Sequence, residues 1–297
     1  MLHASLKYVD IIRQRTSKWA NWSPEKDDIR VGSYGRFNAE TGRLDVLGNV
    51  YDPEFQKLID ATDGKLKLSD YPPVLDDEEK DFAVGTMGVR PKDFSPGPND
   101  VEHLDKAKYK QDWQFLPDKR GAILVMHKPR QEHFPKGRVF EALYKVPELK
   151  DLCIVPTVYK CRAYAVYLSN KTGEKVSLAL LPKSGEENET GLNWWTNTQE
   201  EHLQLKTDED YVFSPLFTCK RKIPLIRPLM RDSPTPDPED AGFWMDSYPT
   251  WEPLDEDGEI DPVYDDDYDD PNVYNPRRDA PYVPYSPSPE PEEEEDD

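Results

Sequence analysis

The chain is poor in the residues that usually mark a secreted or membrane protein. It has only three cysteines, Cys153, Cys161 and Cys219, and this odd, sparse set argues against a disulfide framework and fits a reducing compartment. No apolar run approaches the ~18 residues of a membrane span, and none of 7–15 residues lies near the N-terminus, so we expect no signal peptide. The sequence therefore predicts a cytoplasmic protein, with the nucleus as the alternative.

Patterns that carry catalysis or bind metals are also missing. No Gly-x-Ser-x-Gly motif occurs, and the spacings of Cys153 to Cys161 and of His127 to His133 do not match those of zinc sites. The pair Gly32 and Gly35 lacks the Lys-Ser/Thr of a phosphate loop, so we predict that these glycines serve a bulge or tight turn. We expect no catalytic site, no cofactor and no metal.

Basic residues are almost absent from the last 66 positions. Residues 232–297 hold 24 acidic side chains, two basic ones and 13 of the 29 prolines, whereas residues 1–231 carry a net charge of +1. A segment with so few clustered apolar residues cannot offset the entropy of ordering its backbone. We predict a globular body, residues 1–231, and a disordered acidic tail rich in proline and tyrosine, residues 232–297.

Apolar spacing in the body predicts an α+β fold, predominantly antiparallel β with a few helices. Residues 2–19 form an amphipathic helix, which packs on the body or, as the alternative, lies on a membrane surface. Residues 60–81 are polar and offer the only candidate domain boundary. Other expected elements are hairpins at 29–51 and 108–126, a helix at 138–148, a third hairpin of strands at 152–168 and 176–181, and a final strand at 211–218.

A basic stretch directly precedes the acidic tail, and two tryptophans follow within it. Opposite charges so close in sequence favour a tail that folds back and masks basic surface; the alternative is a solvated tail. The tryptophans, set among acids and prolines, are typical of a docking segment for the body or for a partner. The candidate interaction residues are Lys220, Arg221, Lys222, Arg227, Arg231, Trp244 and Trp251.

Four short stretches are familiar: Val31–Arg36, Thr41–Arg43, Gly48–Tyr51 and Arg120–Met126. Together they resemble a functionally uncharacterised family from mushroom-forming (basidiomycete) fungi, over most of residues 25–220. The resemblance implies no activity and no site residue. The layout of N-terminal helix, β-rich body and tail is loosely similar to gasdermin-type pore formers, as an analogy of architecture alone.

These observations predict a non-enzymatic intracellular interaction protein. Its acidic tail binds basic protein partners or masks the basic surface of the body through an intramolecular contact. The tail would repel phosphate, so nucleic acid is not an expected partner. The alternative is an autoinhibited membrane-binding or pore-forming protein that is released by removal of the tail, and only this alternative involves a membrane surface.

Overall fold

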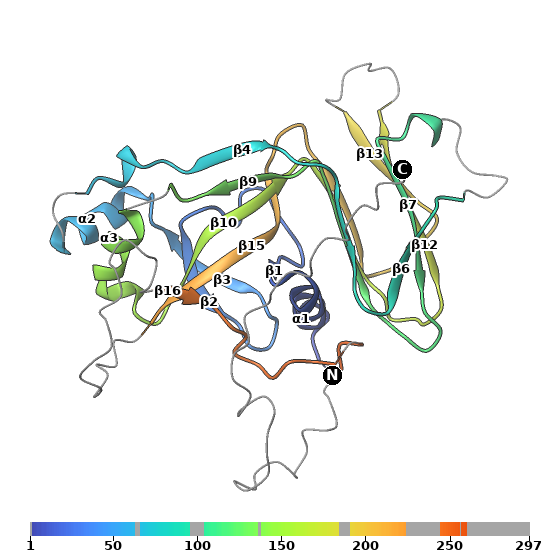
Figure 1. Cartoon of the computed structure of the whole chain (residues 1–297), viewed down its shortest axis with the longest axis horizontal. Coiled ribbons are helices and arrows are strands. Elements are labelled where there is room, and N and C mark those ends of the chain that lie inside the picture. The colour runs from blue at the N-terminus through green and yellow to red at the C-terminus, as the bar shows by residue number, and fades with distance from the viewer. Residues whose placement is uncertain are drawn as a thin grey trace, which may run out of the picture. The chain divides into compact units, whose positions relative to one another are not determined.

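Antiparallel strands dominate the structure, which confirms the predicted α+β class (Figure 1). It is a computed structural model and describes residues 2–62, 66–95, 104–135, 138–183, 191–223, 244–255 and 257–259. The described helices are α1 (Ala4–Thr16), α2 (Pro53–Thr62) and α3 (Val139–Lys145), with 3-10 turns η1 (Leu68–Asp70), η2 (Leu104–Lys106) and η3 (Pro147–Leu149). All described residues belong to one compact unit, residues 1–260.

The largest of the described sheets has eight strands and carries the last strand that the structure describes, β16. Its main order is β1-β15-β10-β2-β3; β9 also pairs with β10, β4 with β9, and β16 with β15. The bounds are β1 (Trp19–Ala20), β2 (Ser33–Phe37), β3 (Leu44–Asn49), β4 (Val74–Glu78), β9 (Arg130–His133), β10 (Cys153–Cys161), β15 (Phe213–Lys222) and β16 (Trp244–Asp246). The predicted hairpin at 29–51 is confirmed as β2 and β3.

Two four-stranded sheets form a sandwich around an aromatic core that includes Trp113, Phe115 and Tyr167. One sheet has the order β14-β11-β8-β5 and the other β13-β12-β7-β6. The bounds are β5 (Phe82–Gly85), β6 (Val89–Lys92), β7 (Tyr109–Phe115), β8 (Ala122–His127), β11 (Ala163–Leu168), β12 (Lys175–Pro182), β13 (Leu192–Thr196) and β14 (Leu203–Thr207). Every residue of β8 and β11 is buried, because their outer faces pack with α1 in a larger apolar cluster, which we call the main core.

The predicted hairpin at 108–126 is wrong in its pairing. Its two strands exist, as β7 and β8, but β7 pairs with β6 and β12 while β8 pairs with β5 and β11. The turn between them passes the chain from one sheet of the sandwich to the other. The predicted hairpin of strands 152–168 and 176–181 is also wrong. Its first strand divides at Arg162 into β10 and β11, which lie in different sheets, and neither of them pairs with β12. Alternating polarity identifies which face of a strand is buried, but it does not determine which other strand pairs with it.

The N-terminal helix packs on the body, as the first of the two predicted alternatives has it. Tyr8, Val9 and Ile12 are fully buried, and Ile11 is nearly so. Within the described residues, no helix has both the length and the apolar character needed to cross a membrane. The polar stretch 60–81 is not an open linker, because Leu66 and Leu68 are buried in the main core.

Gly35 is required by a close backbone approach at the β2–β3 bulge. A Cβ there would lie 2.1 Å from the Asp45 carbonyl oxygen, so Gly35→Ala should displace β3 and destabilise the fold by about 1–3 kcal/mol, as overpacking does. Gly173→Ala is the matched control: its φ is +69° but nothing lies within 4 Å, so only the left-handed strain of about 1 kcal/mol applies. Urea unfolding of both variants measures the difference, and equal losses would contradict the steric argument.

Candidate functional site

Residues 244–259, which we call the strap, lie on the body as an ordered segment. The sequence predicted disorder from residue 232 onward, and for the strap's described residues this is wrong. The physical reason is that the strap concentrates the tail's large apolar side chains: Trp244 and Leu254 are buried, and Trp251 packs on the main core. Residues 232–243 and 260–297, and with them the rest of the tail prediction, lie outside the described residues.

The strap begins as a strand added to an open sheet edge. β16 pairs antiparallel with the end of β15, with Lys222 opposite Trp244 and Lys220 opposite Asp246. The other edge of β15 is taken by β10, and β1 covers only the earlier residues Leu216 and Phe217. The strap therefore satisfies backbone groups that the end of β15 would otherwise present to solvent.

Trp244 anchors this strand in an aromatic recess of α3. Its side chain is 5% exposed, its indole N–H donates to the Phe140 carbonyl oxygen at 3.0 Å, and its ring meets Phe140 and Tyr144 edge-on. The Lys222 ammonium lies 5.9 Å from the Trp244 ring centroid and 5.5 Å from that of Tyr144, within cation–π range. Burial lowers the pKa of Lys222 to about 8.

The structure brings most of the sequence-predicted interaction residues to this edge. Lys220 pairs with Asp246 at 3.2 Å, Arg221 is exposed on β15 opposite Met245, and Lys222 covers Trp244. Trp251 lies apart from them, on α1, and Arg227 and Arg231 lie outside the described residues. Lys220–Lys222 and Trp244 thus meet in one contact. Such a contact is expected if the tail folds back onto the basic stretch.

Asp10 of α1 is the acceptor that holds the middle of the strap. This carboxylate is 2% exposed and accepts three hydrogen bonds of 2.8–2.9 Å: from the indole N–H of Trp251, from the backbone N–H of Leu254 and from the side chain of Gln14. Two of the three donors come from the strap. Since a buried carboxylate needs partners, the strap completes a polar site within the helix.

The Trp251 ring fills an aromatic cluster beside Asp10. It lies edge-on to Trp19 at 5.8 Å between centroids and edge-on to Phe37, and those two rings stack on each other. The Arg13 guanidinium covers Trp19 at 4.9 Å and donates to the Ser247 carbonyl oxygen of the strap. Trp251, the second tryptophan that holds the strap, is therefore surrounded by an apolar recess, a cation and a buried acceptor.

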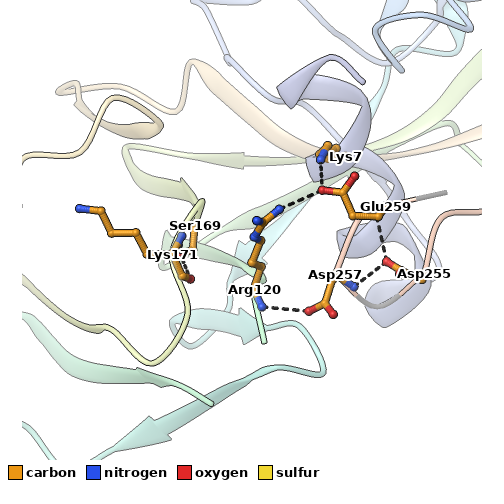
Figure 2. Close-up of polar contacts among 7 residues, drawn as sticks. All are labelled: Lys7, Arg120, Ser169, Lys171, Asp255, Asp257 and Glu259. Atoms are coloured by element: carbon orange, nitrogen blue, oxygen red, sulfur yellow. Dashed lines mark hydrogen bonds and ion pairs between the residues drawn. The ribbon is translucent and has the colours of Figure 1, made fainter. Parts of the chain in front are cut away.

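The end of the strap is an acidic turn that faces cations of the body (Figure 2). Glu259 accepts from Lys7 at 2.5 Å and from Arg120 at 3.0 Å, and Asp257 accepts from the Arg120 backbone N–H at 2.9 Å. The Asp255 carboxylate closes the turn by accepting the backbone N–H groups of residues 257 and 259. The turn thus joins α1 to the β7–β8 connection.

These ion pairs are half-exposed, so their effect should be small and sensitive to salt. Glu259→Gln removes the pairs with Lys7 and Arg120, and we expect it to weaken docking of the turn by on the order of 0.5–1 kcal/mol. Hydrogen exchange of the backbone amides of residues 257–259 measures this, and the difference should vanish at 1 M salt. Glu252→Gln, at an exposed strap position, is the matched control; equal effects of the two variants would refute the assignment.

Sequence reasoning missed the body's half of this surface: Lys7, Asp10, Lys119 and Arg120. Lys119 adds a 3.6 Å pair with Asp257. One signal was present, because Asp10 interrupts the apolar face formed by Leu6, Val9 and Ile12 of the predicted helix. A carboxylate at such a position must find donors, but only the fold shows that they come from the strap.

Comparisons with known proteins add nothing to this geometry: no family model, no curated protein and no solved structure matches the chain. The resemblance to the fungal family therefore stays a prediction. Among the described residues, no group of three or more His, Cys, Asp or Glu side chains is placed to hold a metal ion. The strap and the surface beneath it are the candidate functional site.

Proposed function

We propose that the body is a peptide-binding module and that the strap is its built-in competing ligand. The strap masks the basic edge Lys220–Lys222, the recess of Trp244 and the acceptor Asp10. The observation that carries this proposal is the strand addition of β16 to β15 together with the burial of Trp244. This proposal develops one of the two roles that the sequence predicted for the acidic tail, namely that it masks the basic surface of the body.

The contacts resemble a common mode of peptide recognition. In β-strand addition, main-chain hydrogen bonds supply affinity and pockets for alternate side chains supply specificity. Buried tryptophans that fill recesses are frequent hot spots in such interfaces. Here Trp244 fills a recess beside the added strand, and Trp251, seven positions later, fills a second recess beside Asp10.

The charges define the competing partner. Strap acids meet Lys7, Lys119, Arg120 and Lys220, so a partner that replaces the strap carries an acidic segment with a tryptophan in an extended stretch. A basic partner, the class that the sequence predicts, would instead bind the acids of the strap in competition with these cations. The strap's contacts favour an acidic partner, because they define a shaped recess on the body as well as a positively charged surface.

Binding in trans tests the proposal. A fluorescent peptide of residues 244–259 is added to the full-length protein and to its Trp244→Ala variant. In the unaltered protein the tethered strap competes at a millimolar effective concentration, so little peptide binds. We expect the variant, whose own strap is weakened, to bind the peptide at least about 10-fold more tightly, by fluorescence anisotropy.

A second peptide with both tryptophans replaced by alanine has the same charge and serves as the control. It should bind more weakly than the native peptide at every salt concentration. Equal binding of the two peptides would show that only diffuse charge attraction operates. Failure of the folded variant to bind the native peptide would overturn the proposal.

The alternative of a membrane-acting protein receives no support from α1, because its apolar residues lie in the core. Liposome binding of the Trp244→Ala variant would be the result that favours it. The three free cysteines fit a reducing compartment, so we propose a cytoplasmic or nuclear protein.

A further inference from the structure

Two of the three cysteines meet beneath the strap, in a combination that the sequence does not suggest. Cys153 and Cys161 both belong to β10, but this strand has register shifts on both sides of Thr157–Tyr159. Cys153 instead faces β15, opposite Arg221 and diagonal to Cys219. The sulfurs of Cys153 and Cys219 lie close enough for each to shift the pKa of the other.

The strap closes one side of this thiol pair. The Ser247 hydroxyl lies 3.1 Å from the Cys153 sulfur, and the Ser247 backbone N–H donates to the Cys219 carbonyl oxygen at 2.8 Å. On its open side Cys153 lines a hollow of about 400 Å³, whose other walls include Arg36, Lys150, Arg221 and Tyr248. A small solute can therefore reach Cys153, whereas Cys219 is 2% exposed.

The surroundings make the two sulfurs chemically unequal. The hydrogen bond from Cys219, with that of Ser247 and the charge of Arg221, lowers the pKa of Cys153 to about 7 despite its partial burial. Burial raises the pKa of Cys219, and also that of Cys161. A large share of Cys153 is thus the nucleophilic thiolate at neutral pH, with a protonated thiol held beside it.

We propose that Cys153 is a peroxide-reactive cysteine and that Cys219 is its resolving partner. The inference goes beyond the proposed peptide binding and does not depend on it. The carrying observation is the position of an accessible cysteine, in a cation-lined hollow, diagonal to a second cysteine on the neighbouring strand.

The reaction balances with a hydroperoxide as the oxidant. The Cys153 thiolate attacks one peroxide oxygen; an S–O bond forms, the O–O bond breaks, and the leaving oxygen takes up a proton as water or an alcohol, which leaves the sulfenic acid of Cys153. The Cys219 sulfur then displaces the hydroxyl group. The S–S bond forms, the S–O bond breaks, and the proton of Cys219 leaves with the hydroxide as water. Two thiols supply the two electrons.

Mass spectrometry of the full-length protein after equimolar hydrogen peroxide tests the proposal. We expect a loss of two hydrogens and a peptide crosslinked between Cys153 and Cys219. In Cys219→Ser the reaction should stop at the sulfenic acid, which dimedone traps on Cys153. Cys161→Ser is the matched control and should form the same crosslink. A crosslink that includes Cys161, or no oxidation at Cys153, would overturn the proposal.

Alkylation of the reduced, folded protein by iodoacetamide gives a readout that needs no cysteine variant. Cys153 should react at least about 10-fold faster than Cys161 and Cys219, with a rate that reaches half its maximum near pH 7. Arg221→Gln should move this midpoint to higher pH, whereas Lys171→Gln, an exposed cation paired with Glu200, should not. Equal reactivity of the three cysteines, or a midpoint unaffected by Arg221→Gln, would contradict the assignment.

Discussion

Replacing Trp244 by alanine should detach the first part of the strap while the body stays folded. Removing a fully buried tryptophan costs about 3–5 kcal/mol, and here the loss falls on one short added strand. Hydrogen exchange should show faster exchange at the β15–β16 pairs, residues 220–222 and 244–246. The amides of β8, in the centre of the sandwich sheet, should keep their protection.

Two variants sharpen this prediction. Trp244→Phe keeps an aromatic ring in the recess but removes the indole hydrogen bond to Phe140, so we expect a smaller loss, of which about 1 kcal/mol is the hydrogen bond. Glu252→Ala, at an exposed strap position, should change nothing. Unchanged protection of β16 in Trp244→Ala would mean that the recess does not hold the strap.

Replacing Asp10 by alanine should release the middle of the strap from α1. The indole N–H of Trp251 and the backbone N–H of Leu254 would lose a charged acceptor, and hydrogen bonds to charged groups contribute about 1.5–3 kcal/mol each. Part of this is regained when the freed groups meet water, so we expect a net loss of about 2–4 kcal/mol. Exchange of the backbone amides of residues 251–255 measures it.

Asp60 of α2 offers a matched control for Asp10. It is also a helical aspartate bonded to a glutamine four positions away, Gln56, at 2.9 Å, but its residue is exposed and no strap covers it. Asp60→Ala should therefore leave the exchange of the strap unchanged. If Asp10→Ala had equally little effect, the aromatic contacts of Trp251 alone would hold this part of the strap.

The fold class could be predicted from the sequence because alternating and helical spacings are local properties. The strands at β2, β3, β7 and β8 lie where the apolar pattern put them. Pairing could not be predicted in the same way: the buried faces of β7 and β8 meet across the sandwich core, and the alternation would be identical if the strands were neighbours in one sheet. Sheet assignment depends on contacts between distant residues, which one sequence does not display.

About half of the candidate site could be predicted from the sequence. Charge blocks and isolated tryptophans are read directly from composition, so Lys220, Lys222, Trp244 and Trp251 were predicted to take part in binding. The strap itself was not predicted, because the disorder prediction used the average composition of residues 232–297. In that average the many acidic residues dominate over the few large apolar side chains that hold the strap. Asp10 and Arg120 gain their role only when the fold brings α1 and the β7–β8 connection to the same acidic turn.

The bond from Leu254 to Asp10 spans 244 positions of the chain, and this has a consequence for the order of synthesis. A ribosome makes α1 long before the strap, so the Asp10 acceptor emerges well ahead of the groups that donate to it. Domains begin to fold during synthesis. A nascent chain that stops before Trp244 would therefore carry an open recess and an open β15 edge. If the proposed peptide binding is correct, an acidic peptide would meet this surface before the strap that competes with it has been made.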